Sequence, residues 1–320
     1  MEPTVLVTGG SGFIGTWVIA ELLRRECRVV VFDLTDGGRK WRHLSGPSAG
    51  EVAFVRGDIL DTKALDQLFD EHPVTHVIHL VGLLTPACQQ DPYRGCEVNV
   101  LGTTRIFEVL RAHKLQIQGV AYASSIAVYG SQKDDTAAAE NVSDGGNPAL
   151  EPLTFYGAFK RANELIARQY WLHFGIPSVG LRPPLVYGWG RETGLTAGPT
   201  LAARALARGE PYAFSFSGPA NFGYVEDAAQ AFVRSALEVR QGSHTVDVPG
   251  GLSTVEEIVS LLKRIEPTAA SRLSIAGPPS PYPAQPSQSG ITRLFPDWKT
   301  TSLEDGFRRT IELYRKTQAG

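Results

Sequence analysis

The stretch Val5-Leu6-Val7-Thr8-Gly9-Gly10-Ser11-Gly12-Phe13-Ile14-Gly15 decides the fold of this chain. It begins as an apolar strand, passes through a glycine-rich turn and ends in the first residues of a helix. Gly9 permits a tight turn, Gly12 lets the backbone approach a pyrophosphate, and Gly15 lets the helix pack closely on the sheet. The positive end of that helix faces the phosphates. The stretch therefore predicts the opening strand, turn and helix of a dinucleotide-binding domain.

The next strand ends on an acidic residue. Asp33 closes the predicted strand Arg28–Asp33, eighteen residues after Gly15. A carboxylate at this place accepts hydrogen bonds from both hydroxyls of an adenosine ribose. A 2′-phosphate there would be repelled by roughly 4 kcal/mol, taking about 4 Å and an effective dielectric of about 20. Asp33 therefore favours NAD over NADP, and we expect the nearby Arg39 and Lys40 to be solvated.

Short apolar runs alternate with helical patterns along residues 4–182. The predicted strands are Thr4–Thr8, Arg28–Asp33, Val52–Gly57, Thr75–Val81, Gly119–Ser124 and Ser178–Arg182, and the predicted helices are Gly12–Arg25, Thr62–Glu71, Val98–His113 and Tyr156–Phe174. The strands are nearly continuous in apolar residues, whereas half-exposed antiparallel strands would alternate. The pattern indicates an α/β fold of the Rossmann type, with a doubly wound parallel sheet covered on both faces.

The pattern changes after residue 182. Residues 183–199 are rich in glycine and proline, and residues 211–223 look irregular. Further helices are predicted at Thr200–Arg208, Tyr224–Val239, Thr254–Lys263 and Ser302–Lys316, with a short strand at Thr245–Val248. We expect residues 1–182, with 221–249 returning to them, to form an NAD-binding domain. Residues 183–220 and 250–320 are expected to form a smaller α/β lobe that binds substrate.

The composition excludes several classes of protein. The chain has 320 residues, with 31 basic against 33 acidic side chains and a formal charge of −2. This near-neutral charge argues against nucleic acid or an anionic membrane as a partner, and no apolar run is long enough to span a bilayer. Three scattered cysteines predict neither a disulfide framework nor a zinc site. With strand-like residues starting at Val5, we expect no signal peptide and a cytoplasmic location.

Tyr156 and Lys160 stand four residues apart, hence on one face of a predicted helix. A tyrosine base near neutral pH needs about 4 kcal/mol of bias toward phenolate. One cation about 4 Å away at an effective dielectric of about 20 supplies roughly that amount. Ser124 and Ser125, which end a buried strand, add a hydroxyl at the same edge of the sheet. Together with the glycine turn, the pair predicts acid/base catalysis rather than a packed tyrosine beside a solvated lysine.

These motifs resemble an extended short-chain dehydrogenase/reductase of the NAD-dependent epimerase/dehydratase family. The resemblance covers essentially the whole chain and rests on segments in family order: Thr8–Gly15, Gly57–Ile59, His79–Gly82, Asn99–Thr103, Ser124–Gly130, Tyr156–Lys160, Leu181–Pro183, Val186–Gly188, Tyr224–Asp227 and Phe295–Ile311.

The resemblance implies a role for each matching residue. Tyr156 would be the acid/base, Lys160 would lower its pKa and hold the nicotinamide ribose, and Ser125 would orient the substrate oxygen. Asp58 would contact the adenine, and Asn99 would join the active-site network. The full set of expected NAD-binding residues is Gly9, Gly12, Phe13, Ile14, Gly15, Asp33, Leu34, Asp58, Ile59, Leu80, Val81, Gly82, Asn99, Tyr156, Lys160, Pro183 and Val186.

Departures from the family pattern bear on the substrate. Ile126-Ala127 stands where dehydratases carry an Asp-Glu pair, so water elimination lacks its second acid/base. Leu185 and Ala220 stand where members that use nucleoside-diphosphate sugars have an Asn and a phosphate-clamping Arg. Loss of a bidentate phosphate donor favours a smaller substrate. The expected substrate-binding residues are Thr85, Ser125, Ile126, Arg191, Thr196 and Thr200, although Arg191 is equally well explained as solvated.

Three functions follow from these observations. The favoured one is an NAD-dependent dehydrogenase that acts on the secondary alcohol of a small sugar, sugar acid or polyol acid. The second is an epimerase with tightly bound NAD, possibly on a nucleotide sugar, and the third is a non-catalytic NAD-binding regulator. The resemblance also implies a homodimer through the helices that follow Asn99 and Tyr156, and no metal is expected.

Overall fold

The computed structural model describes residues 2–46, 52–114, 116–130, 150–194, 196–280 and 289–318. The chain divides into two compact units. The first unit comprises Met1–Val128, Glu151–Arg182 and Ala228–Val246, and the second comprises Tyr129–Leu150, Pro183–Asp227 and Asp247–Gly320. No helix in the described part of the chain is long and apolar enough to cross a membrane.

A seven-stranded sheet forms the centre of the first unit. Its strands are β1 (Thr4–Thr8), β2 (Arg28–Asp33), β3 (Val52–Arg56), β4 (His76–His79), β5 (Gly119–Ala123), β6 (Ser178–Arg182) and β10 (Ser243–Asp247). They are ordered β10-β6-β5-β4-β1-β2-β3, and each neighbouring pair from β6 to β3 is parallel. The predicted fold class is confirmed. The direction of strand succession reverses between β1 and β4, which is where ligands bind to open α/β sheets.

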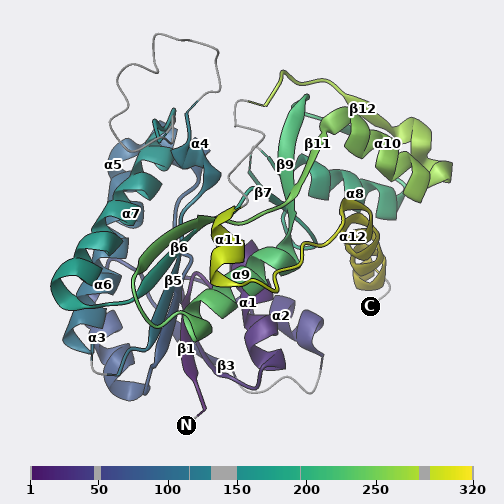
Figure 1. The fold of residues 1–320 in the computed structure, drawn as a ribbon. Helices are drawn as coiled ribbons and strands as arrows, with labels where there is room; N and C mark the ends of the chain where they lie inside the picture. The colour runs from purple at the N-terminus through teal and green to yellow at the C-terminus, as the bar shows by residue number, and fades with distance from the viewer. Residues whose placement is uncertain are drawn as a thin grey trace. The chain divides into compact units, whose positions relative to one another are not determined.

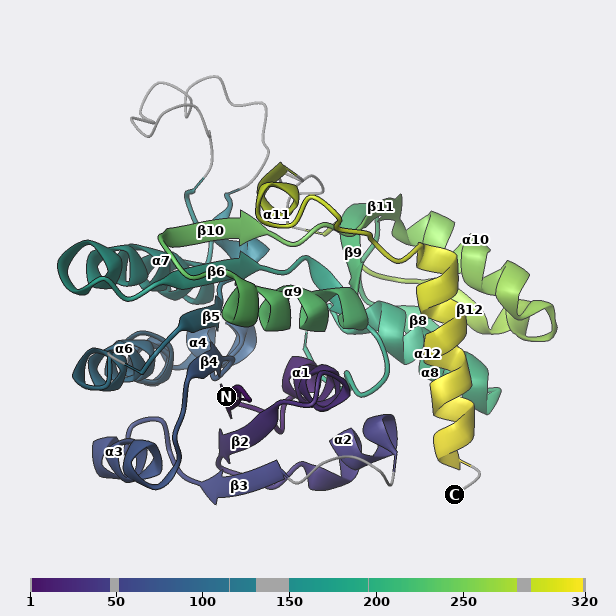
Figure 2. The same cartoon turned by 60° about the horizontal axis from the view of Figure 1, so that its bottom comes forward.

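Helices cover both faces of this sheet (Figures 1 and 2). On one face lie α3 (Thr62–Glu71), α6 (Gly102–Ala112) and α7 (Phe155–Phe174), and on the other lie α1 (Phe13–Arg24), α2 (Gly38–Ser45) and α9 (Val225–Glu238). Apolar strand residues meet the first group in a core where Phe107 stacks on Tyr170 and meets Tyr122 edge-on. Successive residues of the inner strands β1, β4 and β5 are nearly all buried, so both faces of these strands are shielded from water, which explains why they do not alternate in polarity.

Three short helical segments connect β4 to α6: α4 (Thr85–Gln90), α5 (Pro92–Cys96) and a π-helical turn η1 (Glu97–Leu101). Asp91 begins α5 as its N-cap, and its carboxylate accepts a hydrogen bond from Arg94 N. The sequence predicts one α-helix over Val98–His113. The structure corrects this expectation, because the first residues of that segment form the π-helical turn and the α-helix begins only at Gly102.

The second unit contains two small sheets. Strands β7 (Leu185–Tyr187), β9 (Pro219–Tyr224) and β11 (Gly251–Thr254) form one sheet, and β8 (Tyr212–Phe214) pairs with β12 (Leu273–Ile275) in the other. Its helices include α8 (Gly198–Arg208), α10 (Val255–Ile265), α11 (Ser289–Leu294) and α12 (Leu303–Gln318), with a 3₁₀ segment at Pro267–Arg272. The expectation that residues 211–223 are irregular is wrong, because β8 and most of β9 lie there.

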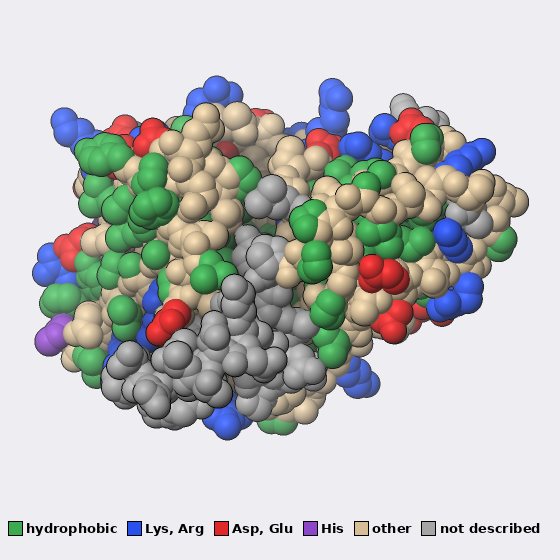
Figure 3. All heavy atoms as spheres, turned by 90° about the horizontal axis from the view of Figure 1, so that it is seen from above, with side chains coloured by type: hydrophobic (Ala, Val, Ile, Leu, Met, Phe, Trp, Pro, Cys, Tyr) green, Lys and Arg blue, Asp and Glu red, His purple; other side chains and the backbone are tan. Residues whose placement is uncertain are grey.

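The compact units also differ from the expected domain bounds. Residues 228–246 belong to the first unit, whereas 221–227 and 247–249 belong to the second. The assignment of NAD to one unit and substrate to the other stays a prediction. On the face drawn in Figure 3, the described acidic and basic side chains lie interspersed rather than gathered into one charged field.

Candidate functional site

The glycine turn and the loop after β4 lie side by side. Thr8, the last residue of β1, is in register with His79, the last residue of β4. Gly9 has φ +74°, and a Cβ on it would lie 2.8 Å from Val81 N. Only glycine combines this left-handed backbone with so close an approach. The predicted NAD-binding segments Gly9–Gly15 and Leu80–Gly82 therefore meet at the point where the strand order reverses.

The turn has the shape that a pyrophosphate requires. A Cβ on Gly15 would lie 2.5 Å from Gly9 O, so glycine lets α1 start directly against the turn. Gly12 is exposed, and a Cβ there would meet only Gly9 O, at 3.2 Å. Phe13 and Ile14 begin α1, whose first backbone N–H groups have no intrahelical acceptors. An open turn of this kind beside a helix start fits the diphosphate of a dinucleotide.

Asp33 is held in place by the backbone around it. Its carboxylate accepts hydrogen bonds from Ser11 N at 3.0 Å and from Thr35 N at 3.2 Å. Each oxygen keeps acceptor capacity for a further donor, as the ribose hydroxyls require. Leu34, the next residue, is 59% exposed and offers an apolar surface beside the carboxylate. The residues present therefore fit the adenosine half of NAD.

Asp58 and Ile59 follow β3 at the same edge of the sheet. One oxygen of Asp58 accepts a hydrogen bond from Leu60 N at 2.9 Å, and the other lies 3.6 Å from the Arg94 guanidinium. Ile59 is buried in the core. Only the backbone and the half-exposed carboxylate of this pair are thus available to an adenine.

Helix α7, which carries Tyr156 and Lys160, begins against the loop that carries Ser125. The Thr154 hydroxyl accepts a hydrogen bond from Gly157 N, which caps the helix. A Cβ on Gly157 would overlap Ala127 O, so only glycine lets this first turn approach the loop so closely. Ser125 Oγ accepts a hydrogen bond from Ala127 N at 3.1 Å. The close approach of Gly157 to Ala127 brings the first turn of α7, with Tyr156, next to the loop that carries Ser125. Ile126, the residue between Ser125 and Ala127, is buried.

Lys160 is buried on the same face of α7 as Tyr156. Its side chain is 3% exposed, and its ammonium lies 5.6 Å from the centre of the Tyr156 ring. Burial lowers the pKa of Lys160 to about 8, and the nearby Cys88 thiol acts in the opposite direction. His79 accompanies it in the interior between the hydroxyls of Thr8 and Thr103, and burial lowers its pKa to about 3. Lys160 is therefore the cation beside the tyrosine at neutral pH, while His79 is neutral.

Asn99 lies in the π-helical turn and is fully buried. Its amide nitrogen donates to Leu83 O, Cys88 Sγ and Gly95 O at 3.0–3.3 Å. Asn99 O in turn accepts a hydrogen bond from Asn163 on α7. The turn thus connects the loop after β4 to α7.

A buried carboxylate braces α7 against the sheet. Glu164 accepts from Ser124 Oγ at 2.5 Å and from both Arg182 Nε and an Arg182 terminal nitrogen at 2.7 and 2.8 Å. It stands one helical turn after Lys160, and Ser124 directly precedes Ser125. Sequence reasoning missed Glu164 because nothing local distinguishes it from the exposed acids of other helices. Gly157 was missed too, although a glycine inside a helical pattern is a detectable signal.

The remaining predicted residues belong to the second unit, apart from Thr85, which begins α4. Arg191 donates to Val186 O and, at 2.7 Å, to Thr196 Oγ1. Thr200 is fully buried, and its hydroxyl accepts a hydrogen bond from Gly188 N. Pro183 is also buried. Arg191 is therefore held against β7, the strand that precedes it, rather than extended into solvent. Its role toward substrate stays a prediction.

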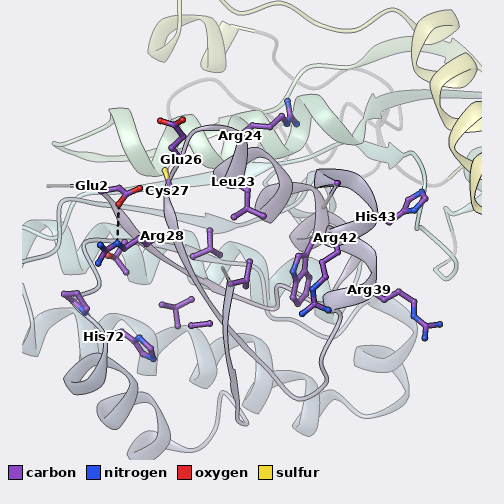
Figure 4. A pocket seen from close by; sticks show the side chains of 18 residues that line it. Glu2, Leu23, Arg24, Glu26, Cys27, Arg28, Arg39, Arg42, His43 and His72 are labelled. Atoms are coloured by element: carbon purple, nitrogen blue, oxygen red, sulfur yellow. Dashed lines mark hydrogen bonds and ion pairs between the residues drawn. The ribbon is translucent and has the colours of Figure 1, made fainter. Parts of the chain in front are cut away.

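A large hollow of about 1660 Å³ lies elsewhere on the first unit (Figure 4). Its walls include Thr4, Arg28 and Val52, where β1, β2 and β3 begin. In a parallel sheet this is the edge opposite the glycine turn. None of the predicted site residues lines it, so we do not assign the hollow to the cofactor. In the described ranges, no group of three or more His, Cys, Asp or Glu side chains is arranged to hold a metal ion.

Comparisons with known proteins agree with this geometry. The family model described as NAD dependent epimerase/dehydratase family matches residues 5–248. UDP-glucuronate 4-epimerase 6 of Arabidopsis thaliana is 32% identical over 194 residues, which cover 59% of this chain and 41% of that protein. The chain thus matches less than half the length of this curated relative.

Two solved structures share the fold. The UDP-glucose 4-epimerase of Thermus thermophilus in complex with NAD has 25% identity and a TM-score of 0.79, covering 98% of this chain and 99% of that one. A partial consensus L-threonine 3-dehydrogenase has 21% identity and a TM-score of 0.80, covering 98% of this chain and 100% of that one. The second likeness shows the fold alone. Because the family model spans well over half of the residues, this chain belongs to the NAD dependent epimerase/dehydratase family.

Proposed function

We propose that the protein is an NAD-dependent enzyme that oxidises the secondary alcohol of a small sugar, sugar acid or polyol acid. The observation that carries this proposal is the buried Lys160 ammonium on the same helical face as Tyr156. Burial of a charged lysine costs hydration free energy. Such burial is typical of sites where the charge acts on a neighbouring group. A protein that only bound NAD would have no need of this arrangement beside Ser125.

Each polar group has a separate task in this proposal. Ser125 Oγ donates a hydrogen bond to the substrate oxygen and aligns it with the tyrosine. Tyr156 takes the hydroxyl proton, and the Lys160 ammonium stabilises the phenolate that this requires. NAD, when bound, supplies the hydride acceptor. Gly9–Gly15, Asp33 and the chain after β4 would hold its phosphates, ribose and nicotinamide half.

The second unit supports a substrate without a diphosphate. Leu185 and Ala220, which replace the Asn and Arg expected for nucleotide sugars, are 4% and 1% exposed. Apolar side chains at these positions offer no charge-assisted hydrogen bond to a phosphate. Arg191 and Thr196 form a hydrogen-bonded pair that has the chemistry to bind a carboxylate or sugar hydroxyls.

A second candidate is a nucleotide-sugar 4-epimerase with retained NAD. It is favoured by the relatives, since both the Arabidopsis protein and the Thermus structure carry 4-epimerase names with UDP-sugars. The two candidates share the first oxidation and differ in the fate of the hydride. In the epimerase it returns to the opposite face of the same carbon.

An absorbance assay separates these functions. The protein is incubated with NAD and with small sugars, sugar acids, polyol acids or UDP-sugars, and NADH formation is followed. Turnover of added NAD supports the dehydrogenase, while isomerised product without net NADH supports the epimerase. Tyr156→Phe is expected to retain NADH binding and lose turnover by at least 100-fold, the lower range for a general base. Equal turnover in Tyr156→Phe would refute both.

We also propose that the protein forms a homodimer through α6 and α7. Leu165 and Leu172, two turns apart on α7, are 47% and 59% exposed, and Leu101 before α6 is 43% exposed. Burial of these side chains against a second copy would remove apolar area from water. Sedimentation velocity at micromolar concentration is expected to show a dimer, and a monomer at every concentration would contradict the proposal.

A further inference from the structure

The thiol of Cys88 joins two parts of the first unit that the proposed reaction uses. Cys88 is fully buried on α4. Its Sγ donates to Leu83 O at 3.2 Å and accepts from Asn99 Nδ2 at 3.3 Å. Leu83 directly follows the expected NAD-binding segment Leu80–Gly82. One side chain thus links the chain after β4 to the π-helical turn.

The acceptors around Asn99 fix the orientation of its amide. The Nδ2 group donates to Leu83 O and Gly95 O as well as to Cys88 Sγ. The opposite orientation would place Oδ1 against two carbonyl oxygens, which have no proton to donate. Oδ1 therefore points to the other side, where it has no hydrogen-bond partner among the described residues.

The Lys160 ammonium lies on that other side. A Cβ built on Gly82 would lie 2.6 Å from Asn99 Oδ1 and 3.2 Å from Lys160 Nζ. The two atoms are therefore within about 6 Å of each other. A buried amide oxygen that faces a buried ammonium favours the charged form of the lysine.

We propose that Cys88 is a positioning residue for Lys160: its thiol contacts the Asn99 amide and holds Leu83 O, one of the two carbonyl oxygens that orient this amide, so that Oδ1 faces the ammonium. The inference rests on the proposed function, in which Lys160 acts as a cation. The other titratable groups that face Lys160 are Tyr156 on its own helix and His79 on β4, and the pKa of His79 is too low for it to carry charge.

Loss of the thiol is expected to weaken NADH binding and to change the pH dependence of that binding. Without Cys88, the Asn99 amide loses one of its three contacts and Leu83 O loses its thiol donor, so Oδ1 is held less firmly toward the ammonium. The pKa of Lys160, already lowered to about 8 by burial, then falls further. An alkaline loss of NADH affinity would move to lower pH, by about half a unit or more if one hydrogen bond is lost.

The test compares Cys88→Ala, Cys88→Ser and, as a buried control, Cys27→Ala. Cys27 lies beyond the C-terminal end of α1, and its thiol donates to Arg25 O. NADH affinity is measured by fluorescence titration from about pH 6 to about pH 10, together with thermal unfolding. Cys88→Ala is expected to bind NADH about three- to tenfold more weakly at pH 8, with its alkaline limb shifted down. Cys88→Ser restores most of the affinity, because a hydroxyl also accepts from Asn99 and donates to Leu83 O.

Two results would overturn the proposal. One is that NADH affinity depends on pH in Cys88→Ala in the same way as in Cys27→Ala. The other is a serine variant as weak as the alanine variant, since this would assign the effect to packing. Cys88→Val, which fills the space without hydrogen bonding, replaces the alanine variant if the latter does not fold. Failure of the unmodified protein to bind NADH would refute the proposed function itself, and this inference with it.

Discussion

Replacement of Glu164 by glutamine tests whether the buried carboxylate holds helix α7 to the sheet. The side chains of Glu164 and Arg182 are 1% and 8% exposed, and two hydrogen bonds of 2.7 and 2.8 Å join them. Ser124 Oγ donates to the same carboxylate at 2.5 Å. Glutamine keeps the shape and one acceptor, but it removes the negative charge that faces the buried Arg182 guanidinium.

The expected magnitude follows from this burial. Removal of one partner of a buried ion pair costs about 3–5 kcal/mol of unfolding free energy, because the remaining charge is uncompensated. For a chain of this size that corresponds to a fall in Tm on the order of 10 °C. Replacement of both partners, Glu164→Gln with Arg182→Met, removes both charges of the pair and is expected to recover a large part of the loss.

Urea unfolding followed by circular dichroism measures these changes, with Glu304→Gln as the control. Glu304 and its partner Arg308 are 51% and 50% exposed, so loss of that surface pair costs at most about 0.5 kcal/mol. If Glu164→Gln lowers the free energy of unfolding by no more than Glu304→Gln does, the proposed stabilising role of Glu164 is refuted. A double variant less stable than Glu164→Gln alone would refute it too. Because Glu164 stands one turn from Lys160, turnover of the single variant is expected to fall as well.

Three further outcomes are expected. Gly82→Ala places a methyl group 2.6 Å from Asn99 Oδ1 and 3.2 Å from Lys160 Nζ, so both Tm and NADH affinity should fall, the affinity about tenfold or more, and unchanged affinity in a fluorescence titration would contradict this. Burial lowers the pKa of His76 to about 4 and of His79 to about 3, so the unfolded state binds more protons below about pH 6.5. The free energy of unfolding therefore decreases as pH falls from there toward 4. In His76→Gln, the urea unfolding midpoint should depend less steeply on pH than in the unmodified protein. Asp33→Asn removes the charge that would repel a 2′-phosphate, and the ratio of NAD to NADP affinity should fall at least tenfold, whereas an unchanged ratio would assign the selectivity to other groups.

Long elements with a clear period were predictable from the sequence. Helix Thr62–Glu71 and strand Ser178–Arg182 have the predicted bounds, because their patterns of apolar residues are complete within one local stretch. The three-residue strands β7, β8 and β12 were not predictable in this way. β8 has three residues and forms only because β12, far along the chain, supplies its hydrogen-bond partners. A strand of that length has no period of its own to detect.

The candidate site divides in the same way. The glycine turn, Asp33 and the four-residue spacing of Tyr156 and Lys160 are local features, so the sequence indicated both their chemistry and their placement at strand ends. The burial of Lys160 and its proximity to Cys88 could not be predicted from the sequence. Both depend on how α4 and the π-helical turn pack against α7, and these contacts join segments that are distant in the sequence.

The sequence by itself determined the alternation of strands and helices and the identity of the groups that ionise or donate, because a residue type and its spacing fix these locally. Only the tertiary structure decided which of those groups are dehydrated and what they face. Glu164 resembles a surface acid until Ser124 and Arg182 close around it. Burial and electrostatic partnership arise from contacts between distant segments, and a local pattern carries no information about them.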